Sequence, residues 1–201
     1  MIDLVRTLCL FGACCYAARH SWGHPVLFLY FASQILYTVA VETALRAVGD
    51  TSLVYAIVYL SFTALVLLAA LGIVWEALLP YTYKLRRMAL FALSAAILTR
   101  FVEVGIHRPL HLSDWVVLLE GGVLYMAGFT LVCISFFSGK KADAYFILSI
   151  LWMCQAGFFW AYLLGLPEAV WIEAGYFVPT AFVVAGFLLV GRRLRTVCKS
   201  E

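Results

Sequence analysis

The chain has 201 residues, of which 65% are hydrophobic and 12% are charged, with a formal net charge of +3. Soluble domains carry about 25% charged residues, so this composition excludes an ordinary soluble fold, and no nucleic-acid partner is expected. The mean hydropathy of +1.00 and the long apolar runs fit a lipid environment instead. We therefore expect an all-α protein, a polytopic transmembrane helix bundle that forms a single domain over residues 1–201.

Seven apolar runs are candidates for membrane-spanning helices. Such a helix needs about 20 mostly apolar residues, and the breaks between these runs contain charge, Gly or Pro. The first run is interpreted as a retained helix, because Asp3 and Arg6 are wrongly placed for the basic start of a cleavable signal. The expected spans are, in chain order, roughly residues 3–18, 25–48, 52–79, 88–106, 114–137, 143–165 and 168–191.

Basic residues are concentrated on one side of the predicted bundle. The side of the membrane that holds the breaks after spans 1, 3 and 5 and the C-terminal tail has ten of the 14 basic residues, against the three acidic residues Glu76, Asp143 and Glu201. Lys and Arg are enriched in short cytoplasmic loops. We therefore expect the N-terminus outside and the C-terminus inside, in the plasma (inner) membrane. The ten residues are Arg19, Lys84, Arg86, Arg87, Lys140, Lys141, Arg192, Arg193, Arg195 and Lys199.

A weak internal repeat would suggest transport. At an offset of 117, five of the 22 pairs from Leu53 to Val74 are identical, where this composition gives roughly two or three by chance. A true repeat would produce a three-plus-one-plus-three layout of helices. The polar residues do not superpose, however, because Glu42 falls on Phe159. The repeat is kept only as support for an alternative.

Ionisable residues inside the spans are the candidate functional residues, since each charge at a helix centre costs about 2.5–3.5 kcal/mol. Glu42 and Arg46 are four residues apart, whereas Arg100, Glu103 and His107 share one face of the fourth span. Nearly all such residues belong to the outer half, so we expect an acidic cavity that opens outward and favours a cation or a basic ligand. Pairing that only ties helices together is the open alternative. The candidate ligand- or ion-binding residues are Glu42, Arg46, Arg100, Glu103, His107, Glu120 and Glu173.

Signals for cofactors and catalysis are weak. A retinal Schiff base needs a lysine in the last span, which has none, so retinal is disfavoured. The pairs His20–His24 and His107–His111 are each local rather than on facing helices, so haem is unlikely, and no metal site is assigned. No catalytic motif is present, so no catalytic residue is assigned and the cofactor is left unknown.

In its hydropathy pattern and in the segments VYAIVYLSF and GIVWEALLPY, the chain resembles small seven-helix bacterial integral membrane proteins with no assigned activity. The resemblance covers the whole length and implies a bundle, but no function. The favoured function is a non-enzymatic helical subunit or binding protein of a membrane assembly. Its partners would be membrane lipids and other membrane chains, or copies of itself. Two alternatives stay open: a small transporter or proton-coupled channel, and an intramembrane hydrolase of a lipid-like substrate in which Glu103 meets Glu42 or Glu120.

Overall fold

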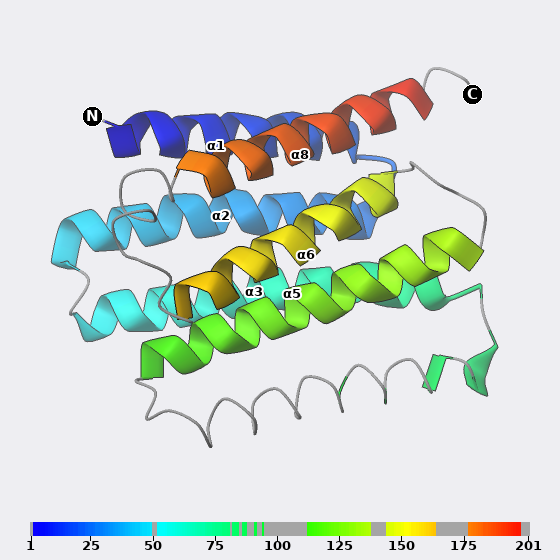
Figure 1. Ribbon diagram of the computed structural model, residues 1–201. Coiled ribbons are helices and arrows are strands. Elements are labelled where there is room, and N and C mark those ends of the chain that lie inside the picture. The colour runs from blue at the N-terminus through cyan, green and yellow to red at the C-terminus, as the bar shows by residue number, and fades with distance from the viewer. Residues whose placement is uncertain are drawn as a thin grey trace. The chain divides into compact units, whose positions relative to one another are not determined.

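The computed structural model describes residues 2–49, 52–80, 82–84, 86–87, 91, 94, 112–137, 144–163 and 177–197. These residues form six long helices and include no strand, which confirms the all-helical prediction for this part of the chain (Figure 1). The helices are α1 (Ile2–His20), α2 (Pro25–Val48), α3 (Leu53–Leu78), α5 (Leu112–Phe137), α6 (Ala144–Leu163) and α8 (Phe177–Val197).

Three stretches within these helices are long and apolar enough to cross a membrane. They are Pro25–Val48, Leu53–Leu78 and Leu118–Phe136, and the shorter stretch Ala144–Phe158 is also apolar. Helices of this length and composition are suited to membrane insertion. The expected fourth span, 88–106, lies almost wholly outside the described residues.

The last helix differs from the expected span at its end. The expected span stops at residue 191, but α8 continues to Val197. Val190 and Leu194 lie one turn apart and are both buried, so α8 still buries apolar side chains past residue 191. As a result Arg192, Arg193 and Arg195, predicted in a tail, lie on a helix.

The chain divides into two compact units. Unit 1 comprises Met1–Ile73 and Thr180–Glu201, and unit 2 comprises Val74–Pro179.

In unit 1, α1 and α2 form an antiparallel hairpin. The backbone N–H of His24 donates to the carbonyl of Ser21 at 2.8 Å, and Pro25 is the first residue of α2, where its missing N–H has no helical partner to lose. At the other end, Gly49 has a φ of 78° and its N–H donates to the carbonyl of Leu45, which terminates α2.

The core of unit 1 is aromatic and joins α2 to α8. The ring of Phe187 lies edge-on to the rings of Phe31 and Tyr30, with centroid distances of 5.2 and 6.4 Å. All three side chains are fully buried. Edge-to-face geometry of this kind adds stability beyond the buried area.

Unit 2 contains the closely packed pair of α5 and α6. A Cβ added to Gly128 would lie 2.6 Å from the carbonyl oxygen of Ser149 and 2.9 Å from Cγ of Met153, so the glycine allows the two backbones to approach. Phe136 and Phe146 meet edge-on at 6.3 Å further along. The largest fully buried side chains of this pair are Leu124, Leu131, Leu148, Leu151 and Trp152.

Candidate functional site

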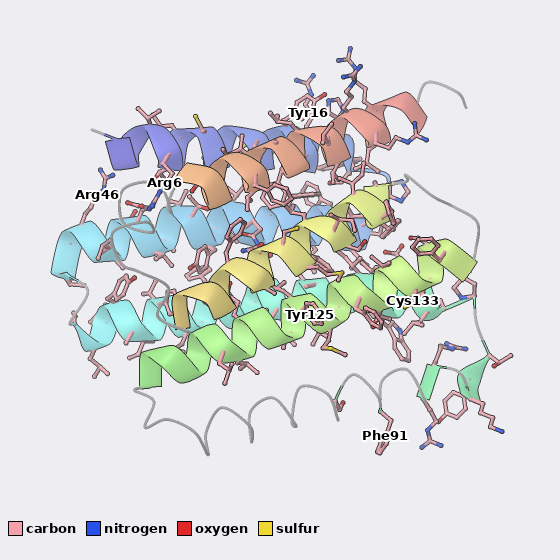
Figure 2. The ribbon with its side chains drawn as sticks, viewed as in Figure 1. Arg6, Tyr16, Arg46, Phe91, Tyr125 and Cys133 are labelled. Atoms are coloured by element: carbon pink, nitrogen blue, oxygen red, sulfur yellow. The ribbon has the colours of Figure 1, made fainter. Side chains whose placement is uncertain are left out.

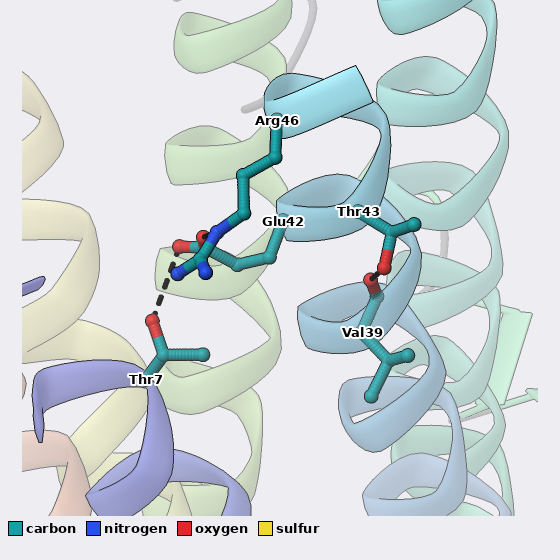
Figure 3. A network of polar contacts seen from close by, with 5 residues as sticks. All are labelled: Thr7, Val39, Glu42, Thr43 and Arg46. Atoms are coloured by element: carbon teal, nitrogen blue, oxygen red, sulfur yellow. Dashed lines mark hydrogen bonds and ion pairs between the residues drawn. The ribbon is translucent and has the colours of Figure 1, made fainter. Parts of the chain in front are cut away.

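Both carboxylate oxygens of Glu42 have side-chain partners in unit 1, one on α1 and the other on α2 itself. Thr7 Oγ1 on α1 donates a hydrogen bond to Glu42 Oε1 at 3.1 Å, and Arg46 Nε lies 3.4 Å from Glu42 Oε2 (Figure 3). Glu42 and Arg46 are one turn apart on α2, in the order that favours a helical ion pair. We call these three residues the Thr7–Glu42–Arg46 cluster.

The two charged side chains of the cluster differ in exposure to solvent. The Arg46 side chain is 58% exposed, whereas that of Glu42 is 25% exposed. Arg46 lies in the last turn of α2. The aliphatic part of its side chain can therefore lie along apolar surface while the guanidinium reaches water. Figure 2 shows Arg6 and Arg46 at the same end of unit 1, where α1 begins and α2 ends. The cluster therefore lies near the end of unit 1 where α1 begins and α2 ends.

The expected pairing of Glu42 with Arg46 is confirmed, but Thr7 was missed. Helices joined by a short connection are antiparallel neighbours, which places the start of α1 level with the end of α2. A polar residue near the start of the first span was therefore the available signal. A nearby hydroxyl shows the contrast, because Thr43 Oγ1 donates to the carbonyl of Val39 within its own helix (Figure 3).

Glu120 lies in unit 2, inside the apolar stretch Leu118–Phe136 of α5. It is 8% exposed, with buried Leu118 and Leu124 on the same helix. A carboxylate at such a position is costly as an anion, so it is either protonated or close to a compensating group.

The other predicted site residues, Arg100, Glu103, His107 and Glu173, lie outside the described residues. The expectation that all the candidate residues converge on one outward cavity therefore stays a prediction. Of the candidates, the structure brings together Glu42 and Arg46.

A second polar group lies deeper in unit 1. Gln34 Nε2 donates to the hydroxyl oxygen of Tyr30 at 3.2 Å, and Thr38 Oγ1 donates to the carbonyl of Gln34. Gln34 thus has the hydrogen-bonding partner that a polar residue in an apolar helix requires. Thr63 on α3 is buried, and its Oγ1 has no hydrogen-bond partner among the described residues.

Metal-binding groups are not seen in the part of the chain that the structure describes: no three His, Cys, Asp or Glu side chains there are placed to share an ion. The thiols of Cys9, Cys14, Cys15, Cys133 and Cys154 are not in disulfides.

Comparison with known proteins adds no relative. No protein-family model, no curated protein and no solved structure matches the chain.

Proposed function

We propose that the chain is a non-enzymatic integral membrane protein, a helical subunit or binding protein of a membrane assembly. In this proposal it crosses the plasma membrane seven times, with the N-terminus outside and the C-terminus inside. Its remaining candidate residues, Arg100, Glu103, His107 and Glu173, complete an outward acidic cavity.

The observation that carries the proposal is that both carboxylate oxygens of Glu42 have partners within the chain, Thr7 and Arg46. A carboxylate with a partner on each oxygen is suited to holding α1 against α2, because a substrate would have to compete with those partners for its remaining lone pairs. This supports a scaffold role for the cluster.

The apolar surface supports a role among other helices. Exposed large apolar side chains occur along α2, including Leu29, Leu36 and Val39, and along α3, including Ile57 and Leu60. In a membrane these faces contact acyl chains or a neighbouring helix, since lipid and leucine are equally apolar.

Photocrosslinking in native membranes tests the proposal. A benzophenone amino acid at position 36 is expected to give a discrete protein adduct, with a partner chain or a second copy. The matched control is Leu27 on the same helix, which is fully buried and should give no intermolecular adduct. Adducts with lipid alone at positions 36 and 60, from a protein that behaves as a monomer, would contradict the subunit proposal.

Glu120 favours a second candidate, a small transporter or proton-coupled channel, because a buried carboxylate in an apolar span suits proton or cation movement. Flux into proteoliposomes separates the two functions. A transporter requires a saturable flux that Glu120→Gln abolishes and that the control Glu76→Gln retains. The subunit proposal predicts no flux above that of empty liposomes.

A further inference from the structure

Basic residues from two helices meet at one end of unit 1. Arg19 and His20 end α1, and Arg192 and Arg195 lie near the end of α8. The two helices run side by side, with Tyr16 of α1 next to α8 (Figures 1 and 2). A Cβ added to Gly191 would lie 2.7 Å from two ring carbons of Tyr16. We call Arg19, His20, Arg192 and Arg195 the basic cluster.

The register of α1 and α8 places the members of the basic cluster at the same level. Tyr16 of α1 lies against Gly191 of α8, and the two helices run in the same direction (Figure 1). His20 and Arg195 each follow four residues after these contact positions, so they lie at the same level of the two helices. The ends that carry the arginines therefore coincide.

The positive charge of the basic cluster has no acidic neighbour among the described side chains of unit 1. The acid described there is Glu42, which is bonded to Thr7, thirteen residues before His20 on α1. That separation corresponds to about 20 Å of helix. Desolvation and then the charges of Arg195 and Arg19 lower the pKa of His20, which lies just past the expected end of the first span at residue 18.

The surroundings of the basic cluster are those of a membrane border. Trp22, in the turn that follows α1, is 78% exposed, and tryptophan is enriched where the bilayer meets water. Arg19, Arg192 and Arg195 are exposed. One turn before Arg192 and Arg193, Leu188 and Leu189 of α8 are exposed apolar side chains.

We propose that the basic cluster binds the phosphate of an anionic phospholipid, with Leu188 and Leu189 contacting its acyl chains. Guanidinium groups match phosphate oxygens in geometry and charge. The adjacent exposed leucines favour a lipid over a soluble phosphate. The proposal rests on membrane insertion, and it is independent of the proposed partner and of which leaflet the site faces.

Native mass spectrometry of the purified full chain, titrated with phosphatidylglycerol or phosphatidylcholine, tests the site. We expect saturable binding with preference for phosphatidylglycerol. The variant Arg19→Gln/Arg192→Gln/Arg195→Gln should bind about 100-fold more weakly, at about fivefold per arginine. The variant with three Arg→Lys changes should bind more weakly than the parent but more tightly than the Gln variant, because it keeps the charge and loses the planar guanidinium geometry. The matched control Lys84→Gln/Arg86→Gln/Arg87→Gln removes the same charge from unit 2 and should also stay within about threefold.

Several outcomes would overturn the proposal. Equal binding of phosphatidylcholine, or an equal loss in the unit 2 control, would show attraction without a site. Displacement of the lipid by glycerol phosphate at comparable concentration would show a soluble-anion site. If the triple Gln variant does not fold, the single Arg195→Gln variant is judged by its expected fivefold loss.

Thermal melting in detergent tests whether the arginines of the basic cluster have a purely structural role. Arginines at helix C-termini also interact with the helix dipole. Without anionic lipid, the triple Gln variant should melt at the same or a higher temperature than the parent, because mutual repulsion is removed. A lower melting temperature, with an unchanged shift on adding phosphatidylglycerol, would assign the arginines to the helix ends and overturn the proposal.

Discussion

Thr7 donates a hydrogen bond to Glu42 across 35 positions of the chain, and this bond joins the start of α1 to the end of α2. The same carboxylate holds Arg46 with its other oxygen. A side-chain contact between two apolar helices specifies their register, which apolar packing alone specifies weakly.

Loss of this bond should loosen the hairpin of α1 and α2. Thr7→Val keeps the shape of the side chain but removes the donor, and we expect a loss of about 0.6 kcal/mol in the free energy of unfolding. Thr43→Val is the matched control, since Thr43 bonds within its own helix and is exposed. Unfolding in mixed micelles measures both. Equal losses in the two variants would show that the bond to Glu42 does not stabilise the hairpin.

Close packing of α5 on α6 should depend on Gly128. Gly128→Ala would place a Cβ 2.6 Å from the backbone oxygen of Ser149, which cannot move aside as a side chain does. We expect a loss of about 1–3 kcal/mol in the free energy of unfolding. Gly122→Ala on the same helix meets nothing within 4 Å and should be neutral or slightly stabilising. Equal effects of Gly128→Ala and Gly122→Ala on the free energy of unfolding would contradict the prediction.

Stability should fall at mildly acidic pH because of His20. Its pKa in the folded state is lowered by desolvation and by Arg195 and Arg19. The unfolded chain therefore binds more protons than the folded one as pH falls through the ordinary histidine value of about 6.5, and stability decreases there until the folded pKa is passed. Melting curves between pH 8 and about pH 5 should show a smaller decrease for His20→Gln than for the parent. Identical pH profiles would exclude this contribution.

The seven-span topology predicts opposite sides for the two ends of α3. In a chain whose six native cysteines are replaced by alanine, Ser52→Cys should react with a membrane-impermeant maleimide in intact cells. A cysteine at Lys84 should react only after the inner face is opened. Lys84 is exposed and Ser52 is partly exposed, so both positions are reachable by the reagent. The reverse labelling pattern would invert the orientation, and labelling of both positions in intact cells would refute a span between them.

The helix bounds show how much the sequence predicts. Residues 25–48 were expected as a span and form α2 without change, because Pro25 begins it and Gly49 ends it. The predicted end of the last span at residue 191 was wrong, because the arginines that follow it suggested a charged tail. Burial of Leu194 keeps that segment helical, and no sequence pattern shows which apolar residue finds a partner.

The contacts of the candidate site also include some that the sequence predicts and some that depend on tertiary packing. Spacing of four residues on one helix was enough to pair Glu42 with Arg46, because helical geometry fixes such neighbours. Thr7 and the approach of Gly191 to Tyr16 depend on which helices adjoin and at what level. Those relations join residues far apart in the chain and depend on packing between helices.

Hydropathy and helical spacing are local properties, so the order of the residues is enough to predict a helical, apolar protein suited to a membrane. The bond from Thr7 to Glu42 and the approach of Gly191 to Tyr16 follow only from the packing of the helices. In a chain this uniformly apolar, composition does not distinguish one helix face from another. Close contacts at Gly191, and hydrogen bonds such as that of Thr7, select the faces that meet.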